Sequence, residues 1–202
     1  MSIYEELAST VRITNKNRLV AYDDALILVG TGRSAFVFRI KSTMTAMKVY
    51  FPAFTRVAME EAEIYKKLQG IVYYPTVYAS GSNFVVMDYI EGLTLFDCMV
   101  NRKVITSSHI TEIDHALSLA IARGLNPSDI HLRNIFITDN GNIKLIDVAR
   151  FRQKKHCHQW EHLKRAFRQF YCKRFFPKKI PVSLLNMIAW LYKKDWIPSY
   201  RT

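Results

Sequence analysis

Cysteine is scarce in this chain of 202 residues, which contains only three. Cys98, Cys157 and Cys172 are widely spaced and odd in number, so a disulfide framework is disfavoured and a reducing, cytoplasmic setting is expected. The N-terminus lacks a basic start followed by an apolar run, so no secretory signal peptide is indicated. The longest apolar run near the C-terminus, residues 182–192, is too short to cross a bilayer. Internal repeats and low-complexity segments are missing as well. We therefore expect one domain, or one domain in two lobes, without a membrane span.

Acidic residues are nearly absent from the last quarter of the chain. Residues 1–149 carry 15 Lys or Arg and 15 Asp or Glu, whereas residues 150–202 carry 14 Lys or Arg against only Glu161 and Asp195. The whole net charge of +12 therefore arises in this C-terminal segment. A neutral body with a cationic end predicts an anionic partner for that end, either RNA or an acidic protein.

The apolar pattern predicts strands in the first part of the chain and helices later. A helix is expected from Thr55, a candidate N-cap, to a stop at Gly70. A second helix is expected over residues 107–124, with Ile110, Ile113, Leu117 and Ile121 on one face. Strands are expected at residues 25–29, 35–40, 44–50 and 82–89, and a hairpin at residues 135–146 that turns at Asp139-Asn140-Gly141.

Two glycines separate the first two predicted strands, in the segment 30–37 with the sequence GTGRSAFV. Glycine lets backbone amides approach phosphate oxygens without a Cβ atom in the way. Because a strand rather than a helix follows, the segment favours a flap over phosphates and disfavours a dinucleotide-binding turn. Taken alone, such a motif is more often a tight hairpin with no ligand.

A lysine and a glutamate are predicted to form a buried ion pair. Lys48 lies inside an apolar strand, where its ammonium group needs a carboxylate or a phosphate. Glu61 falls in the middle of the apolar stripe of the following helix, while Glu60 lies at its edge and Glu63 faces solvent. The simpler alternative is that Lys48 extends along the surface and Glu61 lies at the edge of a groove.

Three polar side chains surround the predicted hairpin. Asn134 precedes it and Asp147 follows it, so the two should lie on neighbouring strands about 5 Å apart. A carboxylate and a carboxamide at that separation suit magnesium, which binds few protein oxygens together with phosphate and water. Asp129 could orient or deprotonate an attacking hydroxyl. Each residue alone is equally well explained as part of a solvated polar loop.

In combination these motifs resemble the protein-kinase superfamily. The order is G-x-G-x-x-A-x-V, A-M-K, a helical glutamate, D-x-x-x-x-N and a hairpin ending in aspartate, and it spans residues 29–147. The resemblance implies that the chain binds ATP and Mg²⁺. It implies that Asp129 is the catalytic base and that Lys48, paired with Glu61, holds the α- and β-phosphates.

The same resemblance implies the remaining site residues. Asn134 and Asp147 would hold Mg²⁺. A glycine-rich loop, a gatekeeper and an adenine-binding hinge would bind the nucleotide through Gly30, Thr31, Gly32, Arg33, Val37, Ala46, Lys48, Met87, Asp88 and Ile90.

The chain also departs from the usual kinase pattern. Ala35 stands at the third glycine of the loop, and a Pro-Ser pair precedes Asp129 in place of His-Arg. His131 stands where lysine is usual, and Val-Ala follows Asp147 in place of Phe-Gly. Only 55 residues follow Asp147, so an activation segment and most peptide-docking helices are missing. The size resembles that of minimal atypical kinases: the RIO type, the small kinase of the tRNA threonylcarbamoyladenosine complex, and short bacterial Ser/Thr kinase-like proteins.

The basic C-terminal segment interleaves cations with aromatic residues, as RNA-binding segments do. The aromatic spacing also fits an amphipathic helix packed on the core, and we favour this interpretation. Its apolar positions are Trp160, Leu163, Phe167, Phe170 and Tyr171.

Histidines in the same segment suggest a zinc site, because His158 and His162 lie one helical turn apart. Their neighbours His156 and Cys157 supply no second pair at ligand spacing. Surface histidines are therefore the simpler interpretation.

The predicted fold is α+β, a protein-kinase-like fold of two lobes. Residues 1–90 would form a β-rich N-terminal lobe with one helix, and residues 91–202 a truncated helical C-terminal lobe. The predicted function is ATP- and Mg²⁺-dependent phosphoryl transfer by a small atypical serine/threonine kinase, with a protein as acceptor. One alternative is a small-molecule kinase, suggested by His131. The other is a nucleotide-binding pseudokinase or ATPase switch that holds RNA or a protein through its basic C-terminus.

Overall fold

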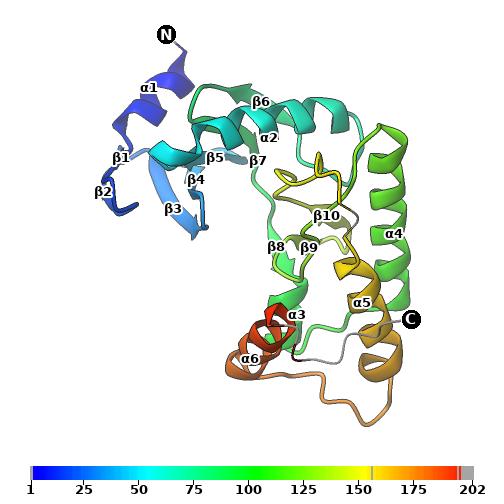
Figure 1. Cartoon of the computed structure of the whole chain (residues 1–202). Helices are drawn as coiled ribbons and strands as arrows, with labels where there is room; N and C mark the ends of the chain where they lie inside the picture. The colour runs from blue at the N-terminus through cyan, green and yellow to red at the C-terminus, as the bar shows by residue number, and fades with distance from the viewer. Residues whose placement is uncertain (1, 156, 195, 197–202) are drawn as a thin grey trace.

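A computed structural model describes residues 2–155, 157–194 and 196 of the chain (Figure 1). Its first half is built on a five-stranded antiparallel sheet with the order β3-β4-β5-β7-β6. The strands are β3 (Leu26–Thr31), β4 (Ala35–Ile40), β5 (Thr45–Tyr50), β6 (Val77–Ser80) and β7 (Phe84–Asp88). The centre of the sheet is apolar, because β7 is almost entirely buried and β5 is largely so.

Two helices and a small hairpin accompany this sheet. The helix α1 (Ile3–Thr10) begins at a capping box formed by Ser2 and Glu5 and is followed by a two-stranded sheet of β1 (Arg12–Ile13) and β2 (Leu19–Ala21). The helix α2 (Thr55–Leu68) packs against β5, β6 and β7. The N-cap of α2 is Phe54 rather than the predicted Thr55. A 3₁₀ turn, Pro52–Phe54, precedes α2 and leaves Thr55 already in helical geometry.

After β7 the chain passes from the large sheet to a small one. The strand β8 (Gly92–Thr94) pairs with β9 (Ile135–Thr138), which pairs with β10 (Ile143–Leu145). Gly92 permits the pairing, because a Cβ atom there would lie 2.4 Å from the carbonyl oxygen of Ile137. The passage between the sheets thus falls at residues 89–91, beside the predicted lobe boundary.

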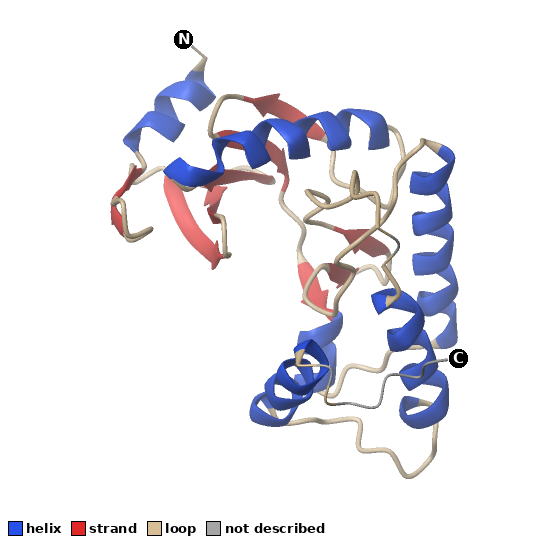
Figure 2. Ribbon diagram, in the orientation of Figure 1, coloured by secondary structure: helices blue, strands red, loops and turns tan. Residues whose placement is uncertain are grey.

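The second half of the chain is mainly helical (Figure 2). Its helices are α3 (Leu95–Val100), α4 (Ser107–Ala122), α5 (Gln159–Ala166) and α6 (Val182–Lys193), and a π-helical turn, Phe167–Tyr171, extends α5. Capping boxes at Thr94 and Thr106 begin α3 and α4. Within the described residues, no helix combines the length and the apolar character needed to cross a membrane.

One large core cluster runs through both halves of the chain. It joins β4, β5 and α2 to α4, the β9–β10 hairpin and α5, and its fully buried members include Tyr65, Ile135 and Phe151. A second cluster fills the space between α1 and the large sheet. Burying each of the largest side chains contributes about 1.5–3 kcal/mol. The shared core therefore holds the glycine-rich turn and the β9–β10 hairpin in a fixed relation.

Two details of the predicted helical faces are wrong. Ile121 is 60% exposed, and Ala120 takes the buried position in the last turn of α4. Phe170 is half exposed, although Trp160 and Tyr171 are buried as predicted. The π-helical turn explains Phe170, because a wider turn rotates the residues within it away from the face that a regular helix would present.

Candidate functional site

Lys48 is the centre of the candidate site. It lies on β5, where the sheet register places it between Val37 of β4 and Val85 of β7. Its Nζ atom is 2.7 Å from Oε2 of Glu61 and 3.0 Å from Oδ1 of Asp147. The predicted ion pair between Lys48 and Glu61 is therefore present, and the β9–β10 hairpin contributes a second carboxylate to the same ammonium group. Burial alone would lower the pKa of Lys48, but these two carboxylates outweigh it and raise the pKa, so the lysine stays charged.

Glu61 is fully buried in α2 and depends on its hydrogen-bonding partners. The hydroxyl of Tyr50 donates to the same Oε2 atom that Lys48 contacts. The other oxygen, Oε1, has no partner among the described residues, and neither does the buried hydroxyl of Tyr65. Burial and the charge of Glu61 raise the pKa of both tyrosines, so both hydroxyls stay protonated.

Asn134 and Asp147 lie side by side at the open end of the hairpin. The backbone N–H of Ile146 donates to the carbonyl of Asn134 at 2.9 Å, and the amide Nδ2 of Asn134 donates to the carbonyl of Asp129 at 3.3 Å. This bond directs the amide oxygen of Asn134 away from the Asp129 backbone. Burial would raise the pKa of Asp147, but the Lys48 ammonium outweighs it and lowers the pKa, so the carboxylate is ionised at neutral pH.

Both aspartates of the candidate site adopt left-handed backbone geometry. The φ angles are +61° at Asp129 and +59° at Asp147. This region is uncommon for residues other than glycine, and such residues cluster at functional sites. The strain points to a requirement for the direction of these two carboxylates.

Asp129 lies in the segment before β9 and has two cationic neighbours. The Nη2 atom of Arg33 is 3.3 Å from its Oδ2 atom, and the Nε atom of Arg150 is 3.4 Å from the same oxygen. Arg33 comes from the turn between β3 and β4, so this contact bridges the two halves of the chain. Near Asp129, burial lowers the pKa of His131, so its imidazole is neutral near pH 7.

The glycine segment forms the turn between β3 and β4. Within it, the N–H of Gly32 donates to the carbonyl of Ala35 at 2.9 Å, and a Cβ atom on Gly32 would lie 3.4 Å from that oxygen. Gly30 and Thr31 end β3 at this turn, and Arg33 extends from it to contact Asp129. This cradle fits a phosphate chain held by backbone amides.

The predicted hinge residues lie on the other side of Lys48 in the sheet. Met87 pairs with Ala46, and Asp88 pairs with Thr45. The carboxylate of Asp88 accepts hydrogen bonds from the N–H of Thr76 and the hydroxyl of Tyr78, so it is directed into β6. Any contact of Asp88 with an adenine base would therefore use its backbone, while Val37, Ala46 and Ile90 offer apolar surface.

The cationic C-terminal segment is anchored to α4 through Asp114. Its Oδ1 atom accepts from Nε1 of Trp160 at 2.7 Å and from Nζ of Lys164 at 2.8 Å. The predicted core role of the aromatic face is thus confirmed at Trp160 and Tyr171. Among the described residues, no group of three or more His, Cys, Asp or Glu side chains could hold a metal ion, and His156 lies outside those residues.

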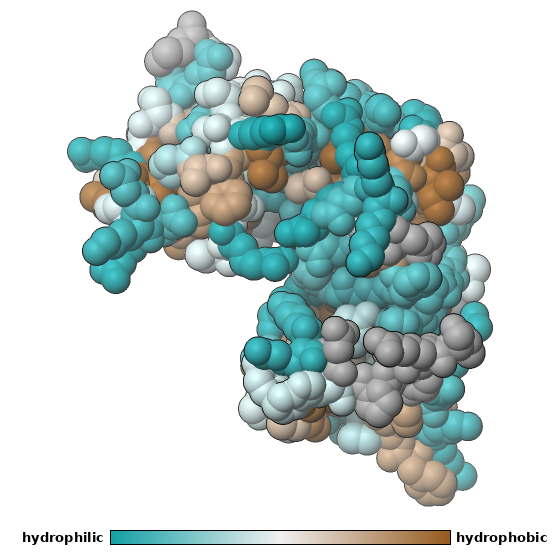
Figure 3. Space-filling model, viewed as in Figure 1, coloured by the Kyte–Doolittle hydropathy of each residue, from teal (hydrophilic) through white to brown (hydrophobic). Residues whose placement is uncertain are grey.

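The candidate site does not coincide with the large cavity of the molecule that lies beside α1. A cavity of about 710 Å³ lies between α1 and the segment 81–84, and its lining includes Tyr50 but none of the predicted site residues. Figure 3 shows a recess between the two halves of the molecule with hydrophilic residues along it, and two ion pairs of the candidate site, Lys48 with Asp147 and Arg33 with Asp129, join these halves. Charge and backbone geometry therefore identify the candidate site better than the volume of a cavity does.

Two residues of the site were not predicted from the sequence. Arg150 contacts Asp129, and Tyr50 contacts Glu61. Arg150 was counted as part of the basic C-terminal segment, and its position three residues after Asp147 was the only available signal. Tyr50 read as one more aromatic residue of a strand, although it lies two residues after Lys48 and so on the same face of β5.

The arrangement brings together the groups that phosphoryl transfer requires. A lysine and a glycine turn could receive an anion, two oxygen ligands suit a hard cation, and a carboxylate is present that could orient a hydroxyl. The residues therefore fit a nucleotide phosphate chain with its magnesium ion.

Comparison with known proteins gave three results. Residues 39–186 match the family model described as the RIO domain. YrzF of Bacillus subtilis (strain 168), provisionally named a serine/threonine-protein kinase, is 46% identical over 202 residues, which cover 97% of this chain and 94% of that protein. The crystal structure of the kinase domain of Mycobacterium tuberculosis PknI matches with a TM-score of 0.50 and 19% identity, over 63% of this chain and 60% of that chain. At that identity the last match shows the fold alone, and it confirms the predicted α+β, kinase-like architecture.

Proposed function

The chain belongs to the RIO-domain family of atypical protein kinases, and we propose that this small ATP-dependent kinase phosphorylates serine or threonine side chains of a protein. The observation that supports this proposal best is the contact of Lys48 with two carboxylates, Glu61 and Asp147. These residues come from a strand, a helix and a hairpin that are distant in sequence. A fold that needed only stability would be expected to bury apolar side chains there, because replacing a buried ion pair by apolar residues is often neutral or stabilising.

We propose that each residue has one task in the reaction. ATP supplies the phosphoryl group that passes to the acceptor hydroxyl with release of ADP, and Mg²⁺ neutralises the charge of the phosphates. Lys48 binds phosphate oxygens, with its position set by Glu61. Asn134 and Asp147 are the protein ligands for Mg²⁺.

The remaining tasks fall to the turn and to Asp129. The turn at Gly30–Gly32 covers the phosphates, and Val37, Ala46, Met87 and Ile90 enclose the base. Asp129 orients the acceptor hydroxyl and accepts its proton. Catalysis then rests on positioning and charge neutralisation by groups already in place.

The test is transfer of label from γ-labelled ATP in the presence of Mg²⁺, with wild type and Asp129→Asn compared on acidic and basic protein acceptors. We expect label on an acceptor or on the chain itself, reduced at least about a hundredfold in Asp129→Asn, because a positioned general base contributes about 10²–10⁴-fold. The variant should still bind ATP, since Asp129 has no assigned contact with the nucleotide and an asparagine oxygen can still accept from Arg33. Equal labelling of wild type and Asp129→Asn would reject the role of Asp129.

A nucleotide-binding switch is the second candidate function. It is favoured by the two arginines that occupy Asp129 and by the buried Ser128, which stands where arginine is usual before the catalytic aspartate. ATP binding with turnover that is unaffected by Asp129→Asn, and with no labelled acceptor, would support it. A screen of small hydroxyl compounds as acceptors tests the small-molecule alternative in the same assay.

Three further proposals concern the setting of the chain. Residues 1–90 and 91–202 are proposed as the two lobes, because the chain passes between the sheets at residues 89–91. The basic C-terminal segment is proposed to bind RNA or an acidic protein through its exposed cations. A cytoplasmic location is proposed because Cys98, Cys157 and Cys172 are all free, as reducing compartments keep them.

A further inference from the structure

Two guanidinium groups converge on one oxygen of Asp129. Arg33 approaches Oδ2 at 3.3 Å and Arg150 approaches it at 3.4 Å. The two arginines belong to opposite halves of the chain and share no element. Their side chains are 73% and 55% exposed, whereas that of Asp129 is 27% exposed. The two cations therefore stand at the rim of the site, with the carboxylate below them.

The stability of the fold does not explain why two surface arginines contact the same carboxylate oxygen. Partly exposed ion pairs contribute only about 0–1 kcal/mol each, and a single arginine already neutralises the carboxylate. The second cation places two exposed guanidinium groups at the rim, where an acceptor hydroxyl must enter, while the other carboxylates of the site, Asp147 and Glu61, pair with Lys48. Guanidinium groups so placed attract an anion on the incoming molecule and repel a cation.

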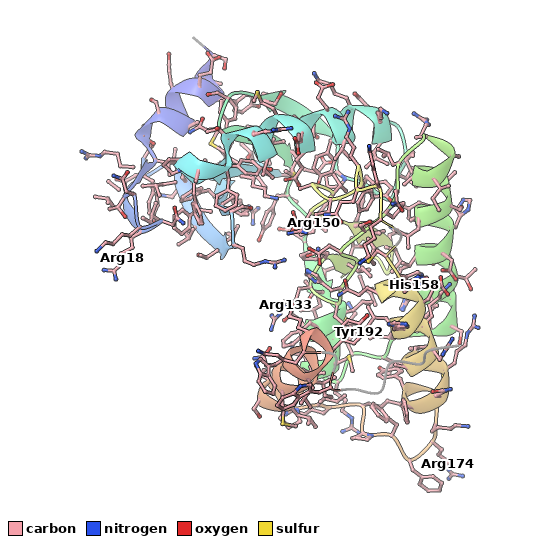
Figure 4. All side chains as sticks on the ribbon, viewed as in Figure 1. Arg18, Arg133, Arg150, His158, Arg174 and Tyr192 are labelled. Atoms are coloured by element: carbon pink, nitrogen blue, oxygen red, sulfur yellow. The ribbon has the colours of Figure 1, made fainter. Side chains whose placement is uncertain are left out.

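The open side of the molecule carries the same charge further. Arg150 and Arg133 both lie along the side that faces the space between the large sheet and α6 (Figure 4). Arg133 is exposed, and it is fixed by a contact over the Phe96 ring, 3.4 Å from the centroid, and by a hydrogen bond to Asn186. An acceptor that approaches Asp129 along this side therefore passes a row of guanidinium groups.

We propose that the acceptor carries an anionic group next to the hydroxyl that is phosphorylated, and that Arg150 binds this anion. The proposal rests on the proposed kinase function and names its substrate class: a polypeptide with a carboxylate or a phosphorylated side chain beside the serine or threonine. Guanidinium groups bind both anions through paired N–H donors. When the anion of the acceptor takes the Arg150 guanidinium, Oδ2 of Asp129 keeps only the Arg33 contact and becomes more available to accept the proton of the hydroxyl.

The choice of Arg150 rather than Arg33 follows from their positions. Arg33 belongs to the phosphate-covering turn, so changing it would disturb nucleotide binding as well. Arg150 lies beyond the hairpin, and its ion pair in the site is with Asp129 and not with a residue of the nucleotide cradle. Arg152 provides a matched control, because it has the same charge two residues away but is exposed and influences Glu63 of α2 instead.

The test uses the full chain and four serine peptides of matched length. Their flanking residues are aspartate, phosphoserine, alanine or lysine, and kcat/KM is measured for each with γ-labelled ATP and Mg²⁺. For wild type and Arg152→Gln, we expect the aspartate or the phosphoserine peptide to exceed the alanine peptide at least about tenfold, the size of one charge-assisted contact. The preferred member of this pair identifies the source of the anion. In Arg150→Gln this preference should disappear while the KM for ATP stays within about threefold.

A reversed charge makes the test sharper. Arg150→Glu should transfer the preference to the lysine peptide, which mere damage to the fold would not do. Equal kcat/KM values on all four peptides in wild type would overturn the proposal and leave the kinase function standing. A preference for acidic peptides that survives in Arg150→Gln would also overturn the proposal and leave the kinase function standing.

If no peptide is labelled, the result counts against the kinase function. The anion site at Arg150 is then tested by peptide binding. The anisotropy of fluorescent aspartate and phosphoserine peptides is then measured with wild type, Arg150→Gln and Arg152→Gln. Binding weakened at least about tenfold in Arg150→Gln alone supports the anion site. Equal binding to all three proteins overturns it. A single-stranded RNA that binds with steep salt dependence and requires Arg150, while neither peptide binds, also overturns it in favour of a nucleic-acid surface.

Discussion

Tyr50 shows how an uncharged residue can control a charged one. Glu61 is fully buried, and one of its oxygens has no partner among the described residues. Its other oxygen is held by Lys48 and by the hydroxyl of Tyr50. Because a buried carboxylate is costly unless it is paired and hydrogen-bonded, the tyrosine helps to keep Glu61 ionised and directed at Lys48.

Tyr50→Phe should therefore reduce both stability and activity. Removing a hydrogen bond to a charged buried group is expected to lower the free energy of unfolding by about 1.5–3 kcal/mol. It should also lower kcat, because Lys48 loses part of its alignment. Urea unfolding and the γ-phosphate transfer assay measure the two effects.

Tyr65→Phe is the matched control at the same carboxylate. The hydroxyl of Tyr65 is equally buried, but it has no partner among the described residues. Its removal should cost at least about 1 kcal/mol less than that of Tyr50, since no hydrogen bond is broken. Equal losses in the two variants would show that Tyr50 acts through packing and not through its hydrogen bond.

At the scale of elements, the sequence predicted what depends on local pattern. The strands of the large sheet, the hairpin after Asn134 and the pairing of Lys48 with Glu61 all follow from apolar periodicity and turn residues. The start of α2, the exposure of Ile121 and the outward direction of Phe170 did not follow. The first depends on a 3₁₀ turn before the helix, the second on how far the core extends along α4, and the third on a π-helical turn. Such departures are decided by tertiary packing, which periodicity does not encode.

The residues of the candidate site also fall into two groups, those that a local motif predicted and those that it did not. Residues that lie close in sequence to a glycine turn or a hairpin were placed by their motif. Arg150 and Tyr50 were missed because their roles arise only when separate segments meet: Arg150 with Asp129 across the β9–β10 hairpin, and Tyr50 with a helical residue eleven positions further on. A contact of this kind leaves no spacing rule in a single sequence.

The attachment of α5 to α4 makes a prediction at this scale. Asp114 accepts from both Trp160 and Lys164, and the pair of bonds joins the cationic segment to the body of the protein. Asp114→Ala should lower the free energy of unfolding by about 1–3 kcal/mol, because the buried Trp160 N–H loses its acceptor. Urea unfolding followed by tryptophan fluorescence measures the loss.

Glu161→Gln is the control for this prediction. Glu161 also contacts Lys164, at 2.9 Å, but its side chain is 58% exposed. An exposed pair of this kind contributes about 0.3–0.5 kcal/mol, so the variant should remain close to wild type. If Asp114→Ala were as mild as Glu161→Gln, the bond to Trp160 would not be what anchors α5.

At the scale of the whole molecule, the site exists only where the two halves of the chain meet. Arg33, Lys48 and Glu61 come from the first half, and Asp129, Asp147 and Arg150 from the second. Two ion pairs of the candidate site cross the junction, Lys48 with Asp147 and Arg33 with Asp129. A ligand that binds both sides of this junction should therefore stabilise the entire fold and not one half alone.

ATP with Mg²⁺ should accordingly raise the melting temperature of the full chain. At a ligand concentration of 100 times Kd the gain is about 2.7 kcal/mol, which corresponds to roughly 5–10 °C for a domain of this size.

Each variant is compared with its own melting temperature in buffer, since replacing a buried charge also alters the starting stability. Lys48→Met should lose most of the shift, because the phosphates lose their cation. Asp147→Asn should retain the shift given by ATP alone and lose the increment that Mg²⁺ adds, while Arg152→Gln should behave as wild type. A full Mg²⁺ increment in Asp147→Asn would remove Asp147 from the metal site, and a full ATP shift in Lys48→Met would place the nucleotide elsewhere on the molecule.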